Sequence, residues 1–301
     1  MSRIDESFLV GLLGSGINAS LTPPMHEMAA DQLGIRYLYR PLDIDALGPH
    51  QRAFTAEDCG TLLSYGLALG YNAFNITYPC KQLIMQHLDQ VSEHALQLGA
   101  VNTVVIEDGA TVGYNTDYSG FSFAVDSGLA LGSEDLDTVL QLGTGGAGSA
   151  TAYALLSRGV KTLFLFDISV QQAQARASTL QDLFPSQKVV ALEPEQLASA
   201  LASSRGLVNA TPIGMHHHPG APIDLSLLRA DLWVADVIYL PQDTPLITAA
   251  RALGARTLPG GLMAVGQAVD AFTLITGQRP DVPELHRFFL QETGNELPHS
   301  F

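Results

Sequence analysis

A glycine-rich turn near the middle of the chain constrains the fold more than any other feature. A G-x-G-x-x-G pattern follows an apolar β-rich run, Thr138–Leu142, and opens a helical stretch, Gly146–Arg158. In such a unit the first glycine allows a tight turn, the second lets the backbone approach a pyrophosphate, and the third lets the helix pack on the strand. The pattern predicts a dinucleotide-binding loop, with a plain strand–helix turn as the alternative. The loop residues are Gly143, Gly145, Gly146, Ala147 and Gly148.

An acidic residue at the end of the next strand strengthens this prediction. Asp167 ends the predicted strand Thr162–Asp167, where a carboxylate can accept hydrogen bonds from both ribose hydroxyls of a dinucleotide. The same carboxylate would repel the 2′-phosphate of NADP, and no Arg or Lys follows until Arg176. The sequence therefore predicts NAD as the cofactor in preference to NADP.

Strands and helices alternate along the rest of the chain, which is typical of an α/β protein. A length of 301 residues exceeds what one hydrophobic core usually serves, so we expect two domains that change sheet near Asp117. An Asp108-Gly109 turn predicts a hairpin between Val104–Glu107 and Thr111–Tyr114. The other predicted strands are Phe8–Leu13, Tyr37–Leu42, Ala73–Ile76, Leu207–Asn209, Trp233–Val237 and a short one near Thr257. The other predicted helices are Pro23–Leu33, Thr55–Leu69, Val170–Leu183 and two in the tail, the second opening after Pro283.

Composition excludes several classes of protein. Fifteen basic residues against thirty acidic ones give a net charge of −15, the wrong sign for binding nucleic acid or an anionic membrane. The amino terminus carries acids where a signal peptide has bases, so we expect a cytoplasmic protein. Two uncharged stretches, Gly60–Cys80 and Thr138–Ser157, are long enough for a membrane span but are interpreted as helix and strand pairs. His216-His217-His218 lacks spaced acidic or thiolate partners, so no metal site is expected.

A second group of candidate residues lies in the first half. Lys81 follows a predicted strand in an uncharged stretch and is one of three lysines, so we expect it to be buried and suited to proton transfer, with a solvated lysine as the alternative. Asp117 follows the hairpin and could equally be a turn or cap residue. Thr22 is a predicted helix N-cap, which leaves the Ser20 hydroxyl at the helix start to hold a carboxylate.

These pieces occur in the order found in one enzyme family. The motifs are Ser20-x-Thr22-Pro-x-x-His26, Asn75-Ile-Thr-x-Pro-x-Lys81, Gly99-Ala-Val-Asn102-Thr103, Gly113-x-Asn115-Thr-Asp117, Gly143-x-Gly-Gly-x-Gly148, Asn209-Ala-Thr211-Pro-x-Gly-Met215, Asp236-x-x-Tyr239-x-Pro241 and Gln267-Ala268. The chain resembles the shikimate dehydrogenase family from about residue 8 to residue 293. The resemblance implies a substrate domain at 1–117 plus 261–301, a Rossmann-type NAD-binding domain at 118–260, and an active site in the cleft between them.

The resemblance also implies residue roles. Lys81 and Asp117 match the catalytic pair, which manages the proton while hydride passes between a ring carbinol and the nicotinamide. The expected substrate is a small polyhydroxy cyclohexane or cyclohexene carboxylate, and the expected assembly is a monomer or homodimer. The residues matching substrate ligands are Ser20, Thr22, Asn75, Thr77, Asn102, Tyr239 and Gln267. Those matching positions near the cofactor, besides the glycine loop and Asp167, are Asn209, Thr211, Val237, Gly260 and Met263.

Two departures from the usual family pattern refine the prediction. Thr22 stands where biosynthetic members have Ser, and Asp167-Ile168-Ser169 stands where they have Asn-Arg-Thr. Both changes resemble the NAD-dependent quinate/shikimate dehydrogenases. The alternatives left open are an aminoshikimate-type dehydrogenase and a nucleotide-sensing homologue that has lost turnover.

Overall fold

The computed structural model describes residues 7–46 and 54–294, which fold as two compact units. Unit 1 comprises Met1–Thr116 and Gln267–Glu292, and unit 2 comprises Asp117–Gly266 and Thr293–Phe301. Compared with the expected boundaries, Asp117, the segment 261–266 and the described residues 293 and 294 fall in unit 2. The amino-terminal segment that we interpreted as lacking a signal peptide lies mostly outside the described residues, as do positions 47–53 and 295–301 of the expected substrate domain.

Unit 1 is built on a mixed six-stranded sheet in the order β2-β1-β3-β5-β6-β4. β5 runs antiparallel to both its neighbours, whereas the other pairs are parallel. The predicted hairpin is confirmed: Asp108 and Gly109 both have positive φ, as a tight two-residue turn requires. The strands are β1 (Ser7–Gly14), β2 (Arg36–Asp43), β3 (Ala73–Ile76), β4 (Gln90–Val91), β5 (Thr103–Glu107) and β6 (Ala110–Tyr114).

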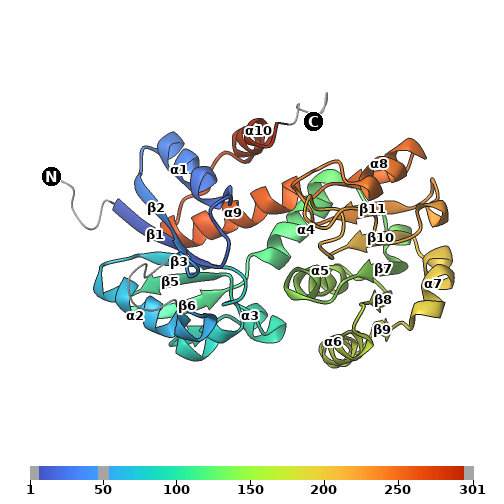
Figure 1. Ribbon diagram of the computed structural model, residues 1–301, viewed down its shortest axis with the longest axis horizontal. Coiled ribbons are helices and arrows are strands. Elements are labelled where there is room, and N and C mark those ends of the chain that lie inside the picture. The colour runs from blue at the N-terminus through green and yellow to red at the C-terminus, as the bar shows by residue number, and fades with distance from the viewer. Residues whose placement is uncertain (1–6, 47–53, 295–301) are drawn as a thin grey trace. The chain divides into compact units, whose positions relative to one another are not determined.

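Helices cover both faces of this sheet because successive strand residues point to opposite sides (Figure 1). On one face Val10, Leu12 and Tyr39 pack with Ile275 of α9. On the other face Phe74 and its neighbours pack with α2 and α3. The helices are α1 (Thr22–Leu33), α2 (Cys59–Ala68), α3 (Glu93–Leu98), α9 (Gly261–Thr276) and α10 (Val282–Glu292). The helix expected at Thr55–Leu69 begins as a 3₁₀ turn, Ala56–Asp58, and α10 begins one residue before Pro283.

Unit 2 is built on a six-stranded, entirely parallel sheet in the order β12-β11-β10-β7-β8-β9. Counted from its first strand, this is the 3-2-1-4-5-6 order of the Rossmann fold, in which ligands bind where the order reverses between the first and fourth strands. That point lies between β7 and β10. The strands are β7 (Thr138–Leu142), β8 (Thr162–Phe166), β9 (Lys188–Ala191), β10 (Gly206–Asn209), β11 (Trp233–Asp236) and β12 (Arg256–Leu258).

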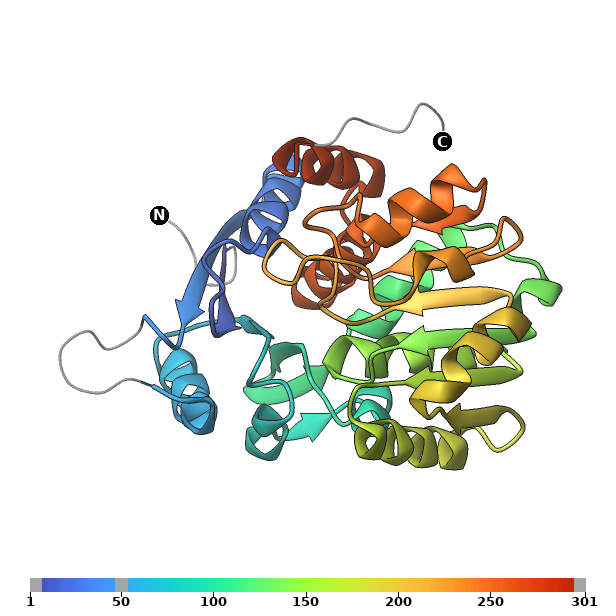
Figure 2. The same ribbon diagram turned by 45° about the vertical axis from the view of Figure 1, so that its right-hand side comes forward.

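The helices of unit 2 lie on both faces of its sheet (Figure 2). α7 and α8 share a core with β7, β10 and β11, while α4 packs against α5. The helices are α4 (Asp117–Gly128), α5 (Gly146–Ser157), α6 (Val170–Leu183), α7 (Leu197–Ser203) and α8 (Pro245–Ala252). The sequence predicted α5 and α6, but β4, β9 and helices α3, α4, α7 and α8 were missed.

The two long uncharged stretches are confirmed as helix and strand pairs. Gly60–Cys80 covers most of α2 together with β3, and Thr138–Ser157 covers β7 together with α5. Among the helices in the described ranges, none is both long and apolar enough to span a bilayer.

Candidate active site

In unit 1 the loops that follow β1 and β3 meet at the carboxyl edge of the sheet. The Thr77 N–H donates to the carbonyl of Leu13 at 2.9 Å, and the Ser15 N–H donates to the carbonyl of Tyr78 at 2.9 Å. The loop that leads to Ser20 therefore starts beside the segment that carries Thr77. Predicted substrate ligands from two loops, Ser20 after β1 and Thr77 after β3, are thereby brought to the same edge of the sheet.

Asp43, at the end of β2, holds the Ser20 loop and was missed by the sequence argument. Its buried carboxylate accepts hydrogen bonds from the backbone N–H groups of Gly16 (3.2 Å) and Ile17 (3.3 Å) and from Nδ2 of Asn18 (3.0 Å). A carboxylate with several donors is well satisfied even when buried. An acid at a strand end was the only available signal, and it did not identify these partners.

The predicted N-cap at Thr22 is wrong. Leu21 occupies the cap position, Thr22 is the first helical residue, and the cap makes no side-chain hydrogen bond. Instead, Ser20 Oγ accepts the Thr22 N–H at 3.3 Å. A serine hydroxyl that accepts a hydrogen bond still has its own proton to donate. Ser20 and Thr22 are half-buried and lie together at the amino end of α1, where the helix dipole favours an anion.

A buried network of hydrogen bonds joins Asn75 to Asn102. Asn75 Oδ1 accepts from the hydroxyl of Tyr39 at 2.6 Å, and its Nδ2 donates to Thr103 Oγ1 at 3.0 Å. The Thr103 hydroxyl donates to Asn102 Oδ1 at 3.1 Å, and the same oxygen accepts the Thr116 N–H at 2.8 Å. These side chains are all buried. The network reaches Thr116, the residue that precedes Asp117.

Lys81 lies in the turn that follows β3 and is half-buried, between the buried and the solvated alternatives that the sequence left open. Its carbonyl accepts the Val101 N–H at 2.9 Å, which ties the turn to the segment that enters β5. The preceding Cys80 is fully buried against Cys59, and the hydrogen bond between the thiols together with burial raises the pKa of Cys80. Such a thiol is a poor nucleophile. Gln267 is half-buried on the part of α9 that belongs to unit 1.

In unit 2 the glycine turn has the geometry that a dinucleotide requires. Gly143 has φ +89, and a Cβ on Gly148 would lie 2.3 Å from the Gly143 carbonyl oxygen, so both positions need glycine. Around Gly145 and Gly146 a Cβ would meet nothing within 4 Å, which leaves open space for a pyrophosphate. Ala147 follows in the first turn of α5. The loop therefore fits the pyrophosphate of the dinucleotide that the sequence predicts.

Gln141, the fourth residue of β7, clamps this turn and was also missed. Its Nε2 donates to the carbonyls of Gly143 (2.9 Å) and Gly148 (2.7 Å), and its Oε1 accepts from Thr151 Oγ1 at 2.9 Å. The side chain is completely buried. A glutamine inside an apolar strand was the signal that could have identified it.

Asp167 is fixed beside the same turn. Its Oδ2 accepts from the Thr144 N–H and hydroxyl, both at 2.8 Å, and its Oδ1 accepts the Ser169 N–H at 3.0 Å. A carboxylate has about four acceptor positions, so Oδ1 retains capacity for a ribose hydroxyl. The neighbouring Ile168 is 98% exposed and brings no charge to this position.

The ends of β10 and β11 are joined by a second buried polar cluster. Asn209 Nδ2 donates to Asp236 Oδ1 at 3.0 Å, and Asn209 Oδ1 accepts from the Thr211 hydroxyl at 2.7 Å. Asp236 Oδ2 accepts from the Thr244 hydroxyl at 2.8 Å. Burial raises the pKa of Asp236 to about 6, against the opposing effect of these donors and of the Ile238 N–H.

The remaining predicted residues of unit 2 follow the strand ends. A Cβ on Gly260 would lie 2.3 Å from the Val237 carbonyl oxygen, so these two segments are in close contact. Met263 lies in the first turn of α9 and is half-buried, and burial raises the pKa of Tyr239. Asp117 is the first residue of α4, where a negative charge is favoured by the helix dipole.

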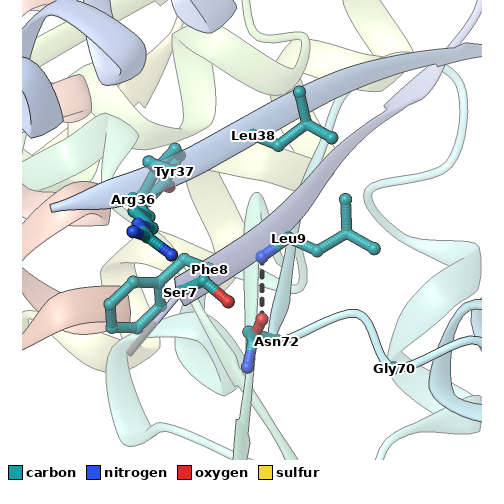
Figure 3. Close-up of a pocket in the computed structure, with 8 residues that line it drawn as sticks. All are labelled: Ser7, Phe8, Leu9, Arg36, Tyr37, Leu38, Gly70 and Asn72. Carbon is teal, nitrogen blue, oxygen red and sulfur yellow. Dashed lines mark hydrogen bonds between the residues drawn. The ribbon is translucent and has the colours of Figure 1, made fainter. Parts of the chain in front are cut away.

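Two other features lie away from these residues. An open pocket of about 400 Å³ is lined by the starts of β1 and β2 and by Gly70 and Asn72, so it lies at the amino edge of the sheet of unit 1 (Figure 3). Ligands of parallel sheets bind at the carboxyl edge. Within the part of the chain that the structure describes, no three His, Cys, Asp or Glu side chains are grouped to hold a metal ion.

Comparisons with known proteins place the chain in a family. Residues 12–104 match the family model of the shikimate dehydrogenase substrate binding domain. The chain is 52% identical to a shikimate dehydrogenase (NADP(+)) of Pseudarthrobacter chlorophenolicus, over 98% of this chain and 99% of that protein. It is 46% identical to a quinate/shikimate dehydrogenase (NAD(+)) of Corynebacterium glutamicum, over 95% and 99%. The structure of quinate dehydrogenase from Corynebacterium glutamicum in complex with NAD superposes with a TM-score of 0.88 at 46% identity, covering 95% of this chain and 99% of that one. With identity of this level along nearly the whole of both chains, the protein belongs to the shikimate dehydrogenase family.

Proposed function

We propose that the protein is an NAD-dependent dehydrogenase that interconverts shikimate and 3-dehydroshikimate, and also quinate and 3-dehydroquinate. The observation that carries the proposal is the gathering of hydroxyl and carboxamide side chains at the carboxyl edge of the unit 1 sheet, beside the turn that carries Lys81. A polyhydroxy ring acid needs such donors and acceptors. Family membership supports the reaction class, because the relatives are named as shikimate and quinate/shikimate dehydrogenases.

In this proposal unit 1 binds the substrate and unit 2 binds the dinucleotide. The hydroxyls of Ser20 and Thr22 hold the ring carboxylate at the start of α1, where the helix dipole is favourable. The methyl group of Thr22 shapes the pocket near the carbon at which quinate carries its additional hydroxyl. The residues assigned to the ring hydroxyls are Asn75, Thr77, Asn102 and Gln267, with Tyr239 also in contact with the substrate.

Lys81 and Asp117 manage the proton of the reacting hydroxyl. A nicotinamide bound by unit 2 would supply the hydride chemistry, oxidation of the ring carbinol or reduction of the ketone. In the oxidation a neutral Lys81 accepts the hydroxyl proton, and in the reduction its ammonium group delivers that proton to the carbonyl oxygen. Asp117 orients the amine and accepts a hydrogen bond from the same hydroxyl.

The cofactor is NAD because of Asp167. The residues that hold the pyrophosphate are Gly143, Gly145, Gly146, Ala147 and Gly148, and Asn209, Thr211, Val237, Gly260 and Met263 line the rest of the site. The Asp167 carboxylate, fixed by Thr144 and Ser169, accepts from the adenosine ribose and repels a 2′-phosphate. Relatives are named for both cofactors, so this residue-level argument carries the choice.

Steady-state kinetics followed at 340 nm test the proposal. The assay combines shikimate, quinate and aminoshikimate with NAD and with NADP. We expect turnover of shikimate and quinate with NAD, and much weaker turnover with NADP. Exclusive oxidation of aminoshikimate would contradict the substrate assignment, and NAD binding without turnover of any of the three would identify a homologue that only senses nucleotide.

A further inference from the structure

A tyrosine of β2 reaches across the sheet of unit 1 to one of the proposed substrate ligands. The Tyr39 hydroxyl donates to Asn75 Oδ1 at 2.6 Å, although β1 lies between their strands. Tyr39 pairs with Val10 and Asn75 pairs with Leu12, two residues further along β1, so both side chains lie on the same face of the sheet. Both are buried, so no solvent replaces this hydrogen bond if it is lost.

The hydrogen bonds around Asn75 fix which way its amide points. The carbonyl of Asn102 lies 3.4 Å from Nδ2 and can only accept, so the amide nitrogen must face it. Thr103 Oγ1 accepts from the same nitrogen at 3.0 Å. The amide oxygen then faces Tyr39. The hydrogen bond from the Tyr39 hydroxyl occupies one of the two acceptor positions of this oxygen. The second acceptor position of Asn75 Oδ1 therefore points in a defined direction.

We propose that Tyr39 is a positioning residue for substrate binding: it holds the Asn75 amide so that Oδ1 accepts a hydrogen bond from a ring hydroxyl. The inference rests on the proposed function, in which Asn75 binds the substrate. Tyr39 itself does not touch the substrate. Its effect passes through Asn75, and a donor on one side of an amide oxygen also strengthens the hydrogen bonds that the amide makes elsewhere.

The neighbouring Tyr37 provides a matched control. It lies on the same strand, and its ring stacks on that of Tyr39 with centroids 6.2 Å apart. Its hydroxyl lies 2.9 Å from His26 Nδ1, which is outside the hydrogen-bond network of Asn75 described above. Tyr39→Phe deletes the hydroxyl of a buried ring, and Tyr37→Phe deletes the hydroxyl of the half-buried ring stacked on it. The two variants differ in the hydrogen-bond partner that each loses.

The experiment measures KM and kcat for shikimate, and KM for NAD, in the full-length enzyme and both variants. Loss of a buried donor to an orienting amide should raise the shikimate KM of Tyr39→Phe roughly tenfold, with kcat changed less and the NAD KM unchanged. Tyr37→Phe should keep all three within about twofold. An unchanged shikimate KM in Tyr39→Phe, or an equal rise in both variants, would overturn the inference.

Two further measurements separate positioning from general damage. In an Asn75→Ala background, Tyr39→Phe should add nothing to the shikimate KM, because its effect needs the amide; additive effects would count against the proposal. If Tyr39→Phe does not fold, Thr103→Val removes the acceptor on the other side of the same amide and should produce the same selective rise. A wild-type enzyme that oxidises neither shikimate nor quinate would contradict the proposed function itself, whereas an active wild type with equal variants contradicts only this inference.

Discussion

A buried carboxamide lies beside the proposed ligand site of each unit, Asn75 in unit 1 and Gln141 in unit 2, and these two amides are held by different kinds of partner. Asn75 of unit 1 is bound by side chains 28 and 36 residues away in sequence, Thr103 and Tyr39. Gln141 of unit 2 is bound by groups 2, 7 and 10 residues away, at Gly143, Gly148 and Thr151. The proposed substrate site thus depends on strand register across a whole sheet, while the proposed nucleotide loop is organised within one strand–turn–helix unit.

The largest effect should come from the proton-transfer residue of unit 1. Lys81→Ala should lower kcat by about 10³ while substrate KM stays within a few-fold, because a proton-transfer contact acts mainly in the transition state. NAD affinity, which belongs to unit 2, should not change. The control is Lys188→Ala, which removes an exposed lysine at the start of β9. A near-normal kcat with a raised KM would reassign Lys81 to substrate binding.

The next effect concerns unit 2 alone. The wild-type enzyme should prefer NAD over NADP by at least about 100-fold in kcat/KM, since a like-charge clash in a partly desolvated site costs several kcal/mol. The double variant Asp167→Asn with Ile168→Arg should narrow or invert this preference, because Arg can bind a phosphate with two parallel hydrogen bonds. Ile168 is almost fully exposed, so the longer side chain has room. Equal efficiency of wild type with both cofactors would refute the role given to Asp167.

Replacing Gln141, the buried amide beside the glycine turn of unit 2, complements the Tyr39 experiment in unit 1. Gln141→Leu leaves the Gly143 and Gly148 carbonyls without their side-chain donor, so we expect the NAD KM to rise about tenfold and the shikimate KM to stay unchanged. Thr151→Val keeps the Gln141 amide and removes the hydroxyl that donates to its Oε1, so it should have a smaller effect in the same direction. A rise in the shikimate KM as large as that for NAD would show that the division between the units is wrong.

The smallest effects should appear in the pH dependence of stability, where the units have opposite signs. Burial lowers the pKa of His26 in unit 1 from 6.5 to about 3, and raises the pKa of Asp236 in unit 2 from 3.8 to about 6. Below pH 6.5 the unfolded chain protonates its histidine while the native His26 stays neutral, so this contribution falls as pH falls. Between pH 4 and 6 the native Asp236 keeps a proton that the unfolded chain loses, so its contribution falls as pH rises.

Segment-resolved hydrogen exchange between pH 4 and 7 can measure both signs. Each group contributes at most about 1.4 kcal/mol per pH unit. Trp233 is the single tryptophan and is buried in β11, so its fluorescence reports unit 2. Asp236→Asn should abolish the gain in stability that unit 2 shows as the pH falls from 6 to 4. The pH dependence of the stability of unit 1 should stay unchanged. The same slope in both units would contradict the pKa shifts.

The contrast between the two amides also explains what could be predicted from the sequence. The glycine turn was predictable because Gly143 needs a positive φ and Gly148 lies against the Gly143 carbonyl, which are both requirements of one strand–turn–helix unit. Tyr39 could not be found, since its partnership with Asn75 follows from the register of two strands with β1 between them. The N-cap expected at Thr22 was wrong because the Ser20 hydroxyl takes the Thr22 N–H. Short elements such as β9 were missed because four residues carry too little periodicity.

The discontinuous course of unit 1 has a consequence for the newly made protein. Phe272 stacks on Tyr37, Ile275 completes the core beneath Tyr39, and α10 packs on α1, yet these residues follow all six strands of unit 2 in the chain. On the ribosome, domains fold as their segments emerge. Unit 2 has all its strands before α9 is translated, whereas one face of the unit 1 sheet stays uncovered until the last part of the chain is synthesised. The nascent chain therefore carries a folded strand and helix layer of unit 2 while the face that holds Tyr39 still exposes apolar surface to solvent and to chaperones.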